Sequence, residues 1–240
     1  MEFISGAVTE QCSDRSHVNQ DKYGAVEVNN IITAVVSDGV SRSYRSEVAS
    51  YNTVLYVLLW ASEYFKNHSF DPDAVIEQLD RRLKHCNSRI NDFSEKFGQG
   101  EYSCCTVSGI VTDGKNMVVF NAGDSRIYEI NVQDEKLYLL TEDNKAPDGH
   151  KISMCMGAFD NDEMRITYTK EPFEEHSVYI LCTDGMYQRS NFKKWGKHLF
   201  GASDRRAMEG FLHQMMCEVR DAGEEDDVTA IAFIRNFKER

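Results

Sequence analysis

The sequence contains no apolar run of about 18 residues, the length that a membrane-spanning helix needs. It also has no basic segment followed by an apolar one after Met1, which is the pattern of a secretory signal peptide. These two absences predict a cytoplasmic protein that does not contact a membrane.

Positive charge is scarce as well. Lys and Arg together number 27 against 39 Asp and Glu, so the formal net charge is −12. A chain this acidic repels polyanions, so we expect no nucleic acid among its partners. The same charge suits a protein that concentrates divalent cations.

The seven cysteines include no pair with Cys-x-x-Cys spacing. Cys104 and Cys105 are adjacent, and Cys155 and Cys182 lie in segments with the pattern of strands. These positions are typical of reduced, mostly buried thiols, and they do not favour a disulfide framework or a zinc site.

The most informative segment that is present is the apolar, β-branched run 31–36, which continues into Ser37, Asp38 and Gly39. An unbroken apolar run predicts a strand that is covered on both faces. A carboxylate at the end of such a strand needs a cation or several hydrogen-bond donors. Gly39 would let a metal or ligand approach the backbone and could offer its own carbonyl oxygen.

The same arrangement occurs twice more in the chain. The apolar run 178–182 leads through Thr183 to Asp184, and the acidic group 224–227 precedes the apolar run 228–234. One Asp-Gly pair after a strand is usually just a turn. Three acids at strand ends favour a shared metal site instead.

The order of the expected elements predicts the fold class. A length of 240 residues with 41% hydrophobic content allows one sizeable core, so we predict a single domain over residues 1–240. A hairpin at Asn29-Asn30 is followed by a helix of about twenty residues after Arg45 and by a second helix that begins at Asp71-Pro72. Strands are expected at 2–8, 23–28, 31–36, 105–111, 117–121, 126–130, 137–140, 164–169, 178–182 and 228–234, and helix at 192–220. This order predicts an α+β protein with helices packed on antiparallel sheet, not a βαβ alternation.

Five short motifs carry a resemblance to a known family. They are Asn19-Gln20-Asp21-Lys22-Tyr23, Asp38-Gly39, Ala122-Gly123-Asp124-Ser125-Arg126-Ile127-Tyr128, Cys182-Thr183-Asp184-Gly185-Met186 and Asp226-Asp227-Val228-Thr229. In order and spacing they resemble the metal-dependent serine/threonine protein phosphatases of the PPM (2C) family, in their compact bacterial form. The resemblance covers nearly the whole chain. It implies a four-layer α-β-β-α sandwich in which helices flank two antiparallel sheets.

The resemblance also implies an activity and a cofactor. The activity is hydrolysis of phosphoserine and phosphothreonine in proteins by a water that two metal ions activate. Ligands that are all oxygen favour Mn²⁺ or Mg²⁺. The implied metal ligands are Asp38, which bridges both ions, the Gly39 carbonyl on the second ion, Asp184 and Asp226 on the first, Asp21 near the second through water, and Asp124 at a weaker third ion. The implied catalytic residues are Asp38, Asp184, Asp226 and Arg15.

The chain departs from the family pattern after Asp38. The segment Asp38-Gly39-Val40-Ser41-Arg42 stands where the family often has Asp-Gly-His-Gly-Gly. The histidine proposed as a general acid in some members is therefore absent. Protonation of the leaving group would then fall to a metal-bound water or to another group, for which His17 is the nearest candidate.

The arginine that grips the substrate phosphate is also displaced. Ser16 falls at the usual position, Arg15 lies one residue before it, and Gln20 replaces an acid of the first motif. Arg15, Arg42 and Arg45 are competing phosphate ligands, and we favour Arg15. The loop 143–151 is short where family members often insert a flap, so we expect an open metal site.

Two other roles are possible for Asp124 besides metal binding. It could cap a turn through its own backbone, or it could form an ion pair with Arg126. For the whole chain, the alternatives are a weak or inactive family member that acts as a binding or sensing module, and a hydrolase of small phosphate esters. We expect phosphoprotein substrates, a serine/threonine kinase that shares its targets, and a monomer.

Overall fold

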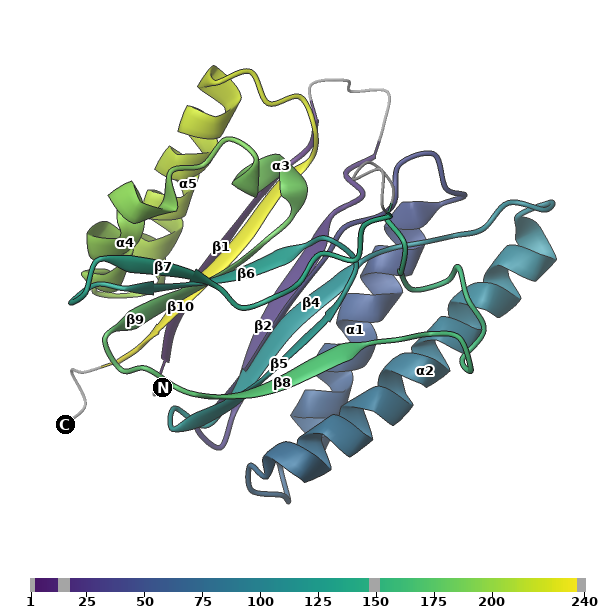
Figure 1. The fold of residues 1–240 in the computed structure, drawn as a ribbon, viewed down its shortest axis with the longest axis horizontal. Coiled ribbons are helices and arrows are strands. Elements are labelled where there is room, and N and C mark those ends of the chain that lie inside the picture. Colours follow the sequence, from purple (N-terminus) through teal and green to yellow (C-terminus); the bar gives the residue numbers. More distant parts are fainter. Residues whose placement is uncertain (1–2, 13–17, 147–151, 237–240) are drawn as a thin grey trace.

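The fold consists of two five-stranded antiparallel sheets that face each other (Figure 1). The computed structural model describes residues 3–12, 18–146 and 152–236. The first sheet has the order β1-β10-β9-β6-β7, and the second has the order β2-β3-β4-β5-β8. The strands are β1 (Phe3–Glu10), β2 (Lys22–Val28), β3 (Ile31–Ser37), β4 (Val107–Thr112), β5 (Asn116–Ala122), β6 (Arg126–Asn131), β7 (Lys136–Leu139), β8 (Thr167–Pro172), β9 (Ser177–Cys182) and β10 (Val228–Arg235).

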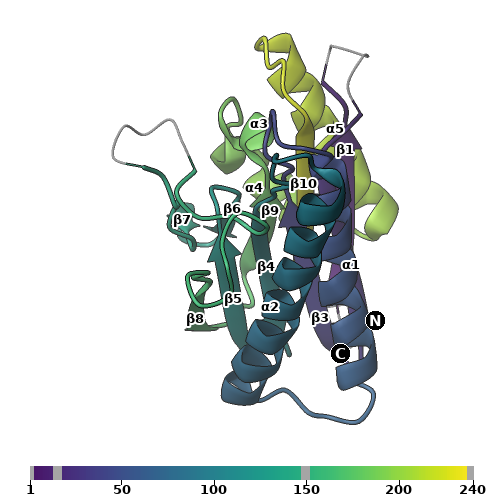
Figure 2. The ribbon, with the colours of Figure 1, turned by 90° about the vertical axis from the view of Figure 1, so that its right-hand side faces the viewer.

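Helices cover the outer face of each sheet (Figures 1 and 2). The long helices α1 (Ser46–Tyr64) and α2 (Pro72–Phe97) lie on the second sheet, and α4 (Phe192–Phe200) and α5 (Arg205–Asp221) lie on the first. A short helix, α3 (Asp184–Tyr187), follows β9. The predicted four-layer α-β-β-α sandwich is therefore confirmed.

Every residue of β3 is buried because both of its faces are covered. Ile31 and Val35 pack in the layer between the second sheet and its helices. Ile32, Ala34 and Val36 point the other way, into the core between the two sheets. The strand predicted from the unbroken apolar run is confirmed, and Asp38 follows directly from its end.

The turns and caps use the residues that the local geometry requires. Asn29 and Asn30 both have positive φ, 50° and 64°, which is the conformation of a two-residue hairpin turn. The Asp71 side chain accepts a hydrogen bond from the Ala74 amide at 3.0 Å and caps the start of α2, with Pro72 in the first turn.

Several expected boundaries are wrong. The helical region expected at 192–220 is two helices, α4 and α5, because the helix is interrupted between Phe200 and Arg205. The strand expected at 164–169 begins at Thr167, and Cys155 lies outside the named strands. The connection from β7 to β8 therefore runs over 140–166, longer than the loop 143–151 that the sequence suggested. In the part of the chain that the structure describes, no helix has the length and apolar character to cross a membrane.

Candidate active site

Five acidic side chains lie at strand ends of the two sheets. Asp21 precedes β2, Asp38 follows β3, Asp124 follows β5, Asp184 follows β9, and Asp226 lies just before β10. Burial raises the pKa of Asp38 well above its usual value, and the charges of the other four acids raise it further. Asp38 is therefore close enough to each of the other four acids for their charges to act on it.

The backbone at Asp38 is fixed by Thr106, a residue that the motifs did not indicate. The Asp38 amide donates to Thr106 Oγ1 at 2.9 Å, and the Thr106 amide donates to the Asp38 carbonyl at 2.8 Å. Gly39 is required by a close approach, because a Cβ at this position would lie 2.9 Å from atoms of Ser46. The first turn of α1 thus packs directly against the residue whose carbonyl is a candidate ligand.

Asp184 begins helix α3 and contacts the end of the same helix. Gln188 Nε2 donates to Asp184 Oδ2 at 3.0 Å. Burial raises the pKa of Asp184 to about 6, and the charges of Asp226 and Asp124 act in the same direction. Asp184 follows β9 of the first sheet, and Asp124 lies in the connection from β5 of the second sheet to β6 of the first.

Asp21 is buried, and its carboxylate is oriented by a hydroxyl from the other sheet. Thr183 Oγ1 donates to Asp21 Oδ2 at 2.7 Å, and the Asp21 amide donates to Asn19 Oδ1 at 2.9 Å. Burial raises the pKa of Asp21 to about 7, whereas the hydrogen bond from Thr183 lowers it. The position of Thr183 next to Asp184 could have suggested that it lies in the site. The sequence could not show that its hydroxyl binds Asp21.

Asp227 organises the loop between β1 and β2. Its Oδ1 accepts a hydrogen bond from the Cys12 amide and its Oδ2 accepts one from the Gln20 amide, both at 2.6 Å. Asp227 is 7% exposed. Sequence reasoning assigned a role to Asp226 and none to Asp227, although both belong to the same acidic motif.

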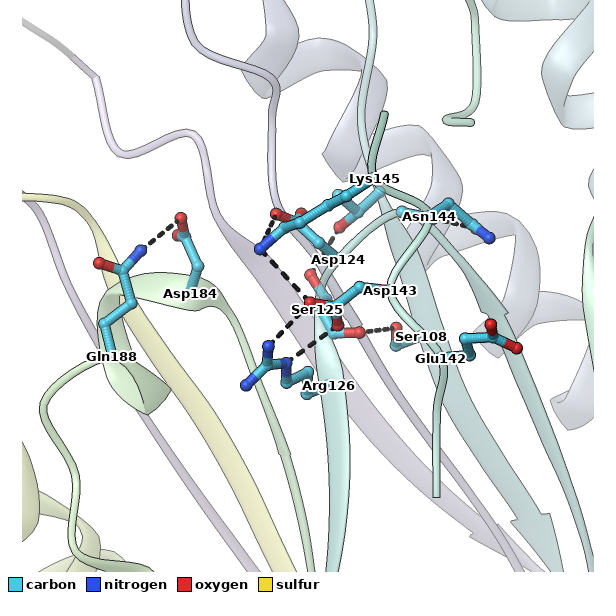
Figure 3. A network of polar contacts seen from close by, with 12 residues as sticks. Ser108, Asp124, Ser125, Arg126, Glu142, Asp143, Asn144, Lys145, Asp184 and Gln188 are labelled. Carbon is cyan, nitrogen blue, oxygen red and sulfur yellow. Dashed lines mark hydrogen bonds and ion pairs between the residues drawn. The ribbon is translucent and has the colours of Figure 1, made fainter. Parts of the chain in front are cut away.

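Asp124 has a lysine as its ionic partner (Figure 3). Lys145 Nζ lies 3.4 Å from Asp124 Oδ2 and 3.3 Å from Asp143 Oδ2. Arg126 donates to Asp143 through two nitrogens, Nε to Oδ1 at 2.9 Å and Nη2 to Oδ2 at 2.8 Å. The ion pair between Asp124 and Arg126 that the sequence left open is therefore wrong, because the guanidinium of Arg126 binds Asp143.

The three candidate phosphate arginines differ in their surroundings. Arg15 lies outside the described residues, as does His17. Arg42, with φ of 67°, lines a cavity of about 510 Å³ together with Asp226. Arg45 is 59% exposed and forms an ion pair with Glu47, Nε to Oε1 at 2.6 Å. A guanidinium that already has a carboxylate partner is a weaker candidate for binding phosphate.

The donor chemistry of the site fits a hard divalent cation. The five acids supply only oxygen, and a cation would offset the repulsion that, after burial, raises the pKa values of Asp38 and Asp184. Among the described residues, however, no group of three His, Cys, Asp or Glu side chains is arranged as a ready metal-binding cluster. The carboxylates are thus gathered around one region without already forming a coordination sphere.

Comparisons with known proteins identify a family and similar folds. The family model described as protein phosphatase 2C matches residues 10–226. A search of curated proteins gave no significant match. Solved structures do match: a bacterial serine phosphatase has 18% identity and a TM-score of 0.80, with 97% of each chain covered.

Two further structures are similar over nearly their whole length. PppA of Pseudomonas aeruginosa, described as a key regulatory component of T6SS, has 16% identity and a TM-score of 0.76, with 98% of this chain and 99% of that chain covered. The catalytic domain of the serine/threonine protein phosphatase PstP, solved with two manganese ions, has 19% identity and a TM-score of 0.76, with 97% of each chain covered. The family model spans most of the chain and agrees with the motifs, so this chain belongs to the protein phosphatase 2C family.

Proposed function

We propose that this chain hydrolyses phosphoserine and phosphothreonine in proteins and that it depends on two divalent metal ions. The observation that carries the proposal is the placement of Asp38, Asp21, Asp184 and Asp226 at separate strand ends, where burial and the charges of the other three raise the pKa of Asp38. Membership of the protein phosphatase 2C family and the similarity to PstP, solved with two manganese ions, support the same chemistry.

The proposed ligands are the oxygen donors at the strand ends. In this proposal Asp38 would hold both ions, the Gly39 carbonyl and Asp21 would serve the second ion, and Asp184 and Asp226 would hold the first. Asp124 is left out of this set because Lys145 is its ionic partner. When bound, Mn²⁺ or Mg²⁺ stabilises the negative charge on the phosphoryl oxygens and lowers the pKa of the attacking water.

The chain's own residues orient these donors. Thr106 forms hydrogen bonds with both the amide and the carbonyl of Asp38. Thr183 donates a hydrogen bond to the Asp21 carboxylate. The Asp227 carboxylate accepts hydrogen bonds from the amides of Cys12 and Gln20. Such positioning lowers the cost of reorganisation when charge develops in the transition state. We propose Arg15 as the phosphate ligand.

The proposed substrates are phosphoproteins, and a serine/threonine kinase that shares these targets is the corresponding partner. A binding or sensing module is the competing function. It is favoured by Gln20, whose Nε2 donates to Ser46 Oγ at 2.5 Å, because an amide here adds no charge to a metal site.

Hydrolysis assays separate these functions. The purified chain is tested on a phosphothreonine peptide and on a generic aryl phosphate, each with Mn²⁺, with Mg²⁺ and with a chelator. We expect turnover of both substrates with metal and none with chelator. Turnover of the aryl phosphate without the peptide would favour a small-ester hydrolase. A folded chain that turns over neither substrate with any metal would favour the binding module.

A further inference from the structure

The ammonium group of Lys145 lies between two carboxylates at the edge of the candidate site (Figure 3). Its Nζ is 3.4 Å from Oδ2 of Asp124 and 3.3 Å from Oδ2 of Asp143. The side chain of Asp124 is 10% exposed and that of Lys145 is 31% exposed. Solvent ions screen a partly buried pair of this kind less than they screen a pair on the open surface.

Asp143 is itself held in place from the opposite side. Arg126 binds both of its carboxylate oxygens, which is the bidentate geometry that fixes orientation as well as distance. The Arg126 guanidinium carbon also lies 4.0 Å from the centre of the Tyr187 ring. The second anchor of Lys145 is therefore rigid.

The backbone beside Lys145 is tied to the backbone beside Asp124. The Asn144 amide donates to the Gly123 carbonyl, and the Gly123 amide donates to Asn144 Oδ1, both at 2.9 Å. The Ser153 amide donates to the Asn144 carbonyl at 2.8 Å. These hydrogen bonds thus hold the backbone that carries Lys145 next to the backbone of Asp124.

We infer that the Lys145 ammonium occupies the position at Asp124 that the family resemblance gives to a weak third metal ion. This inference rests on the proposed function, because it concerns the charge beside the proposed pair of ions. A divalent ion at Asp124 would lie close to the ammonium, and the repulsion between two cations at such a distance opposes its binding. The residues around Asp124 therefore do not fit a third ion.

A tethered cation changes how the site depends on metal concentration. Lys145 neutralises Asp124 at any concentration of metal, whereas a weakly bound ion would do so only when metal is abundant. The rate of the wild-type chain should then reach its plateau once the two proposed ions are bound. A variant without the ammonium should need more Mn²⁺ to reach its own plateau.

Calorimetric titration of the full chain with Mn²⁺ tests the inference without relying on activity. The variants are Lys145→Met, which removes the charge and keeps an unbranched side chain, and Lys145→Glu, which adds a carboxylate beside Asp124. We expect two ions in the wild type and a third, weak ion in both variants. The third ion should bind about tenfold or more tightly in Lys145→Glu than in Lys145→Met, because affinity for hard cations follows the charge of the ligands.

Two further variants give the matched controls. Lys115→Met removes an exposed lysine at the turn between β4 and β5 and should leave the binding of two ions unchanged. The third ion should disappear again in the double variant Lys145→Met/Asp124→Asn. Thermal melting with chelator checks that every variant is folded.

The outcomes are distinct. An unchanged number of ions in both Lys145 variants, or a third weak ion already present in the wild type, would overturn the inference. Absence of tight Mn²⁺ binding in the wild type would contradict the proposed function and the inference with it. The proposed function is tested by the tight binding of the first two ions. The inference about Lys145 is tested separately, by the presence or absence of a weakly bound third ion.

Discussion

Asp38 is half-buried at the end of β3, and burial followed by the charges of four other acids raises its pKa well above the usual value. Ionisation of such a group opposes folding when no cation is near, and the same repulsion favours the binding of a cation. The charge of this one residue therefore lowers the stability of the metal-free fold and strengthens the binding of a cation.

The Asp38→Asn variant should separate these two effects. It removes the charge that we propose both ions share, so turnover of a phosphothreonine peptide should fall by about 10³-fold or more, as for other preorganised electrostatic groups. The melting temperature with chelator should not fall, because the repulsion is also removed. Steady-state kinetics with Mn²⁺ and melting with chelator measure both. Near-normal activity in a folded Asp38→Asn chain would refute the assignment.

Asp21 gives a pH-dependent prediction. Its pKa is about 7 in the folded chain, raised chiefly by burial from a usual value of 3.8. The folded state therefore holds this proton to higher pH than the unfolded state, and the stability linked to it is lost as pH rises from about 4 to about 7. Asp21→Asn does not ionise, so with chelator its melting temperature relative to the wild type should increase from pH 5 to pH 8.

The control for this measurement is Asp113→Asn, since Asp113 lies in a turn away from the site and its carboxylate accepts bonds from the amides of Lys115 and Asn116. Its melting temperature relative to the wild type should not rise with pH in this way. A constant difference between Asp21→Asn and the wild type across the range would show that Asp21 titrates normally.

The candidate phosphate arginines differ in a way that kinetics can detect. Arg15→Ala should lower kcat/KM by an amount that corresponds to the loss of about 1.5–3 kcal/mol of transition-state stabilisation. This is the worth of a hydrogen bond to a charged group. Arg45→Ala should have little effect, because Arg45 already pairs with Glu47. Arg42→Ala is measured beside them, since Arg42 lines the same cavity as Asp226. Equal, small effects at all three positions would mean that none binds the phosphate.

The sequence predicts the acids of the site but not the residues that hold them. Asp38, Asp184 and Asp226 could be found because each follows or precedes an apolar run. Thr106 and Lys145 could not be found, since their partners lie far away in the chain and no local pattern marks a tertiary contact.

At the scale of elements, the loop between β1 and β2 is fastened at both ends by one carboxylate. Asp227 accepts from the amides of Cys12 and Gln20, and hydrogen bonds to a charged acceptor are stronger than neutral ones. Arg15, the proposed phosphate ligand, lies between Cys12 and Gln20 in the sequence, so we expect these two hydrogen bonds to affect binding of the substrate phosphate.

Asp227→Asn tests this fastening. An amide offers one acceptor oxygen in place of two, so one of the two bonds is lost or weakened. We expect a higher KM for the phosphothreonine peptide, with little change in the binding of Mn²⁺. Asp113→Asn again serves as the control, because Asp113 likewise accepts from two backbone amides. Equal KM values for the two variants would mean that the loop does not contribute to substrate binding.

Most elements could be predicted from the sequence, because β-branched runs and spaced apolar stripes mark strands and helices. Helix α3 could not, since four residues are too few to show a helical period. The break between α4 and α5 was missed because residues 201–204 sit between two apolar stripes that read as one. Which strands pair was not predictable either, because β5 and β8 are adjacent in space but separated by β6 and β7 in the chain.

At the scale of the whole molecule, the candidate site draws on both sheets. Asp21 and Asp38 flank strands of the second sheet, and Asp184 and Asp226 flank strands of the first. Asp124 lies in the connection from β5 of the second sheet to β6 of the first. The relative position of the sheets is set by the apolar core between them, which includes Ile231 and Tyr179. A change in that core should therefore reach the site even though it touches none of the acids.

A pair of cavity variants tests this dependence. Ile231→Ala opens the core between the sheets, and Leu212→Ala opens the layer between α5 and the first sheet. Each should cost about 2–5 kcal/mol of unfolding free energy. Only Ile231→Ala should weaken the binding of Mn²⁺, measured at a temperature where both variants are folded. Equal weakening in both would mean that lost stability alone explains the effect.

The pairing of β1 with β10 has a consequence for folding. These strands are joined along their whole length, from Phe3 opposite Arg235 to Glu10 opposite Val228, although they lie at opposite ends of the described chain. During synthesis β1 must wait until β10 has emerged before the first sheet can close. Until then Asp226 and Asp184 have no fixed relation to Asp38. A nascent chain would thus bring the acids of the candidate site together only after β10 had been synthesised.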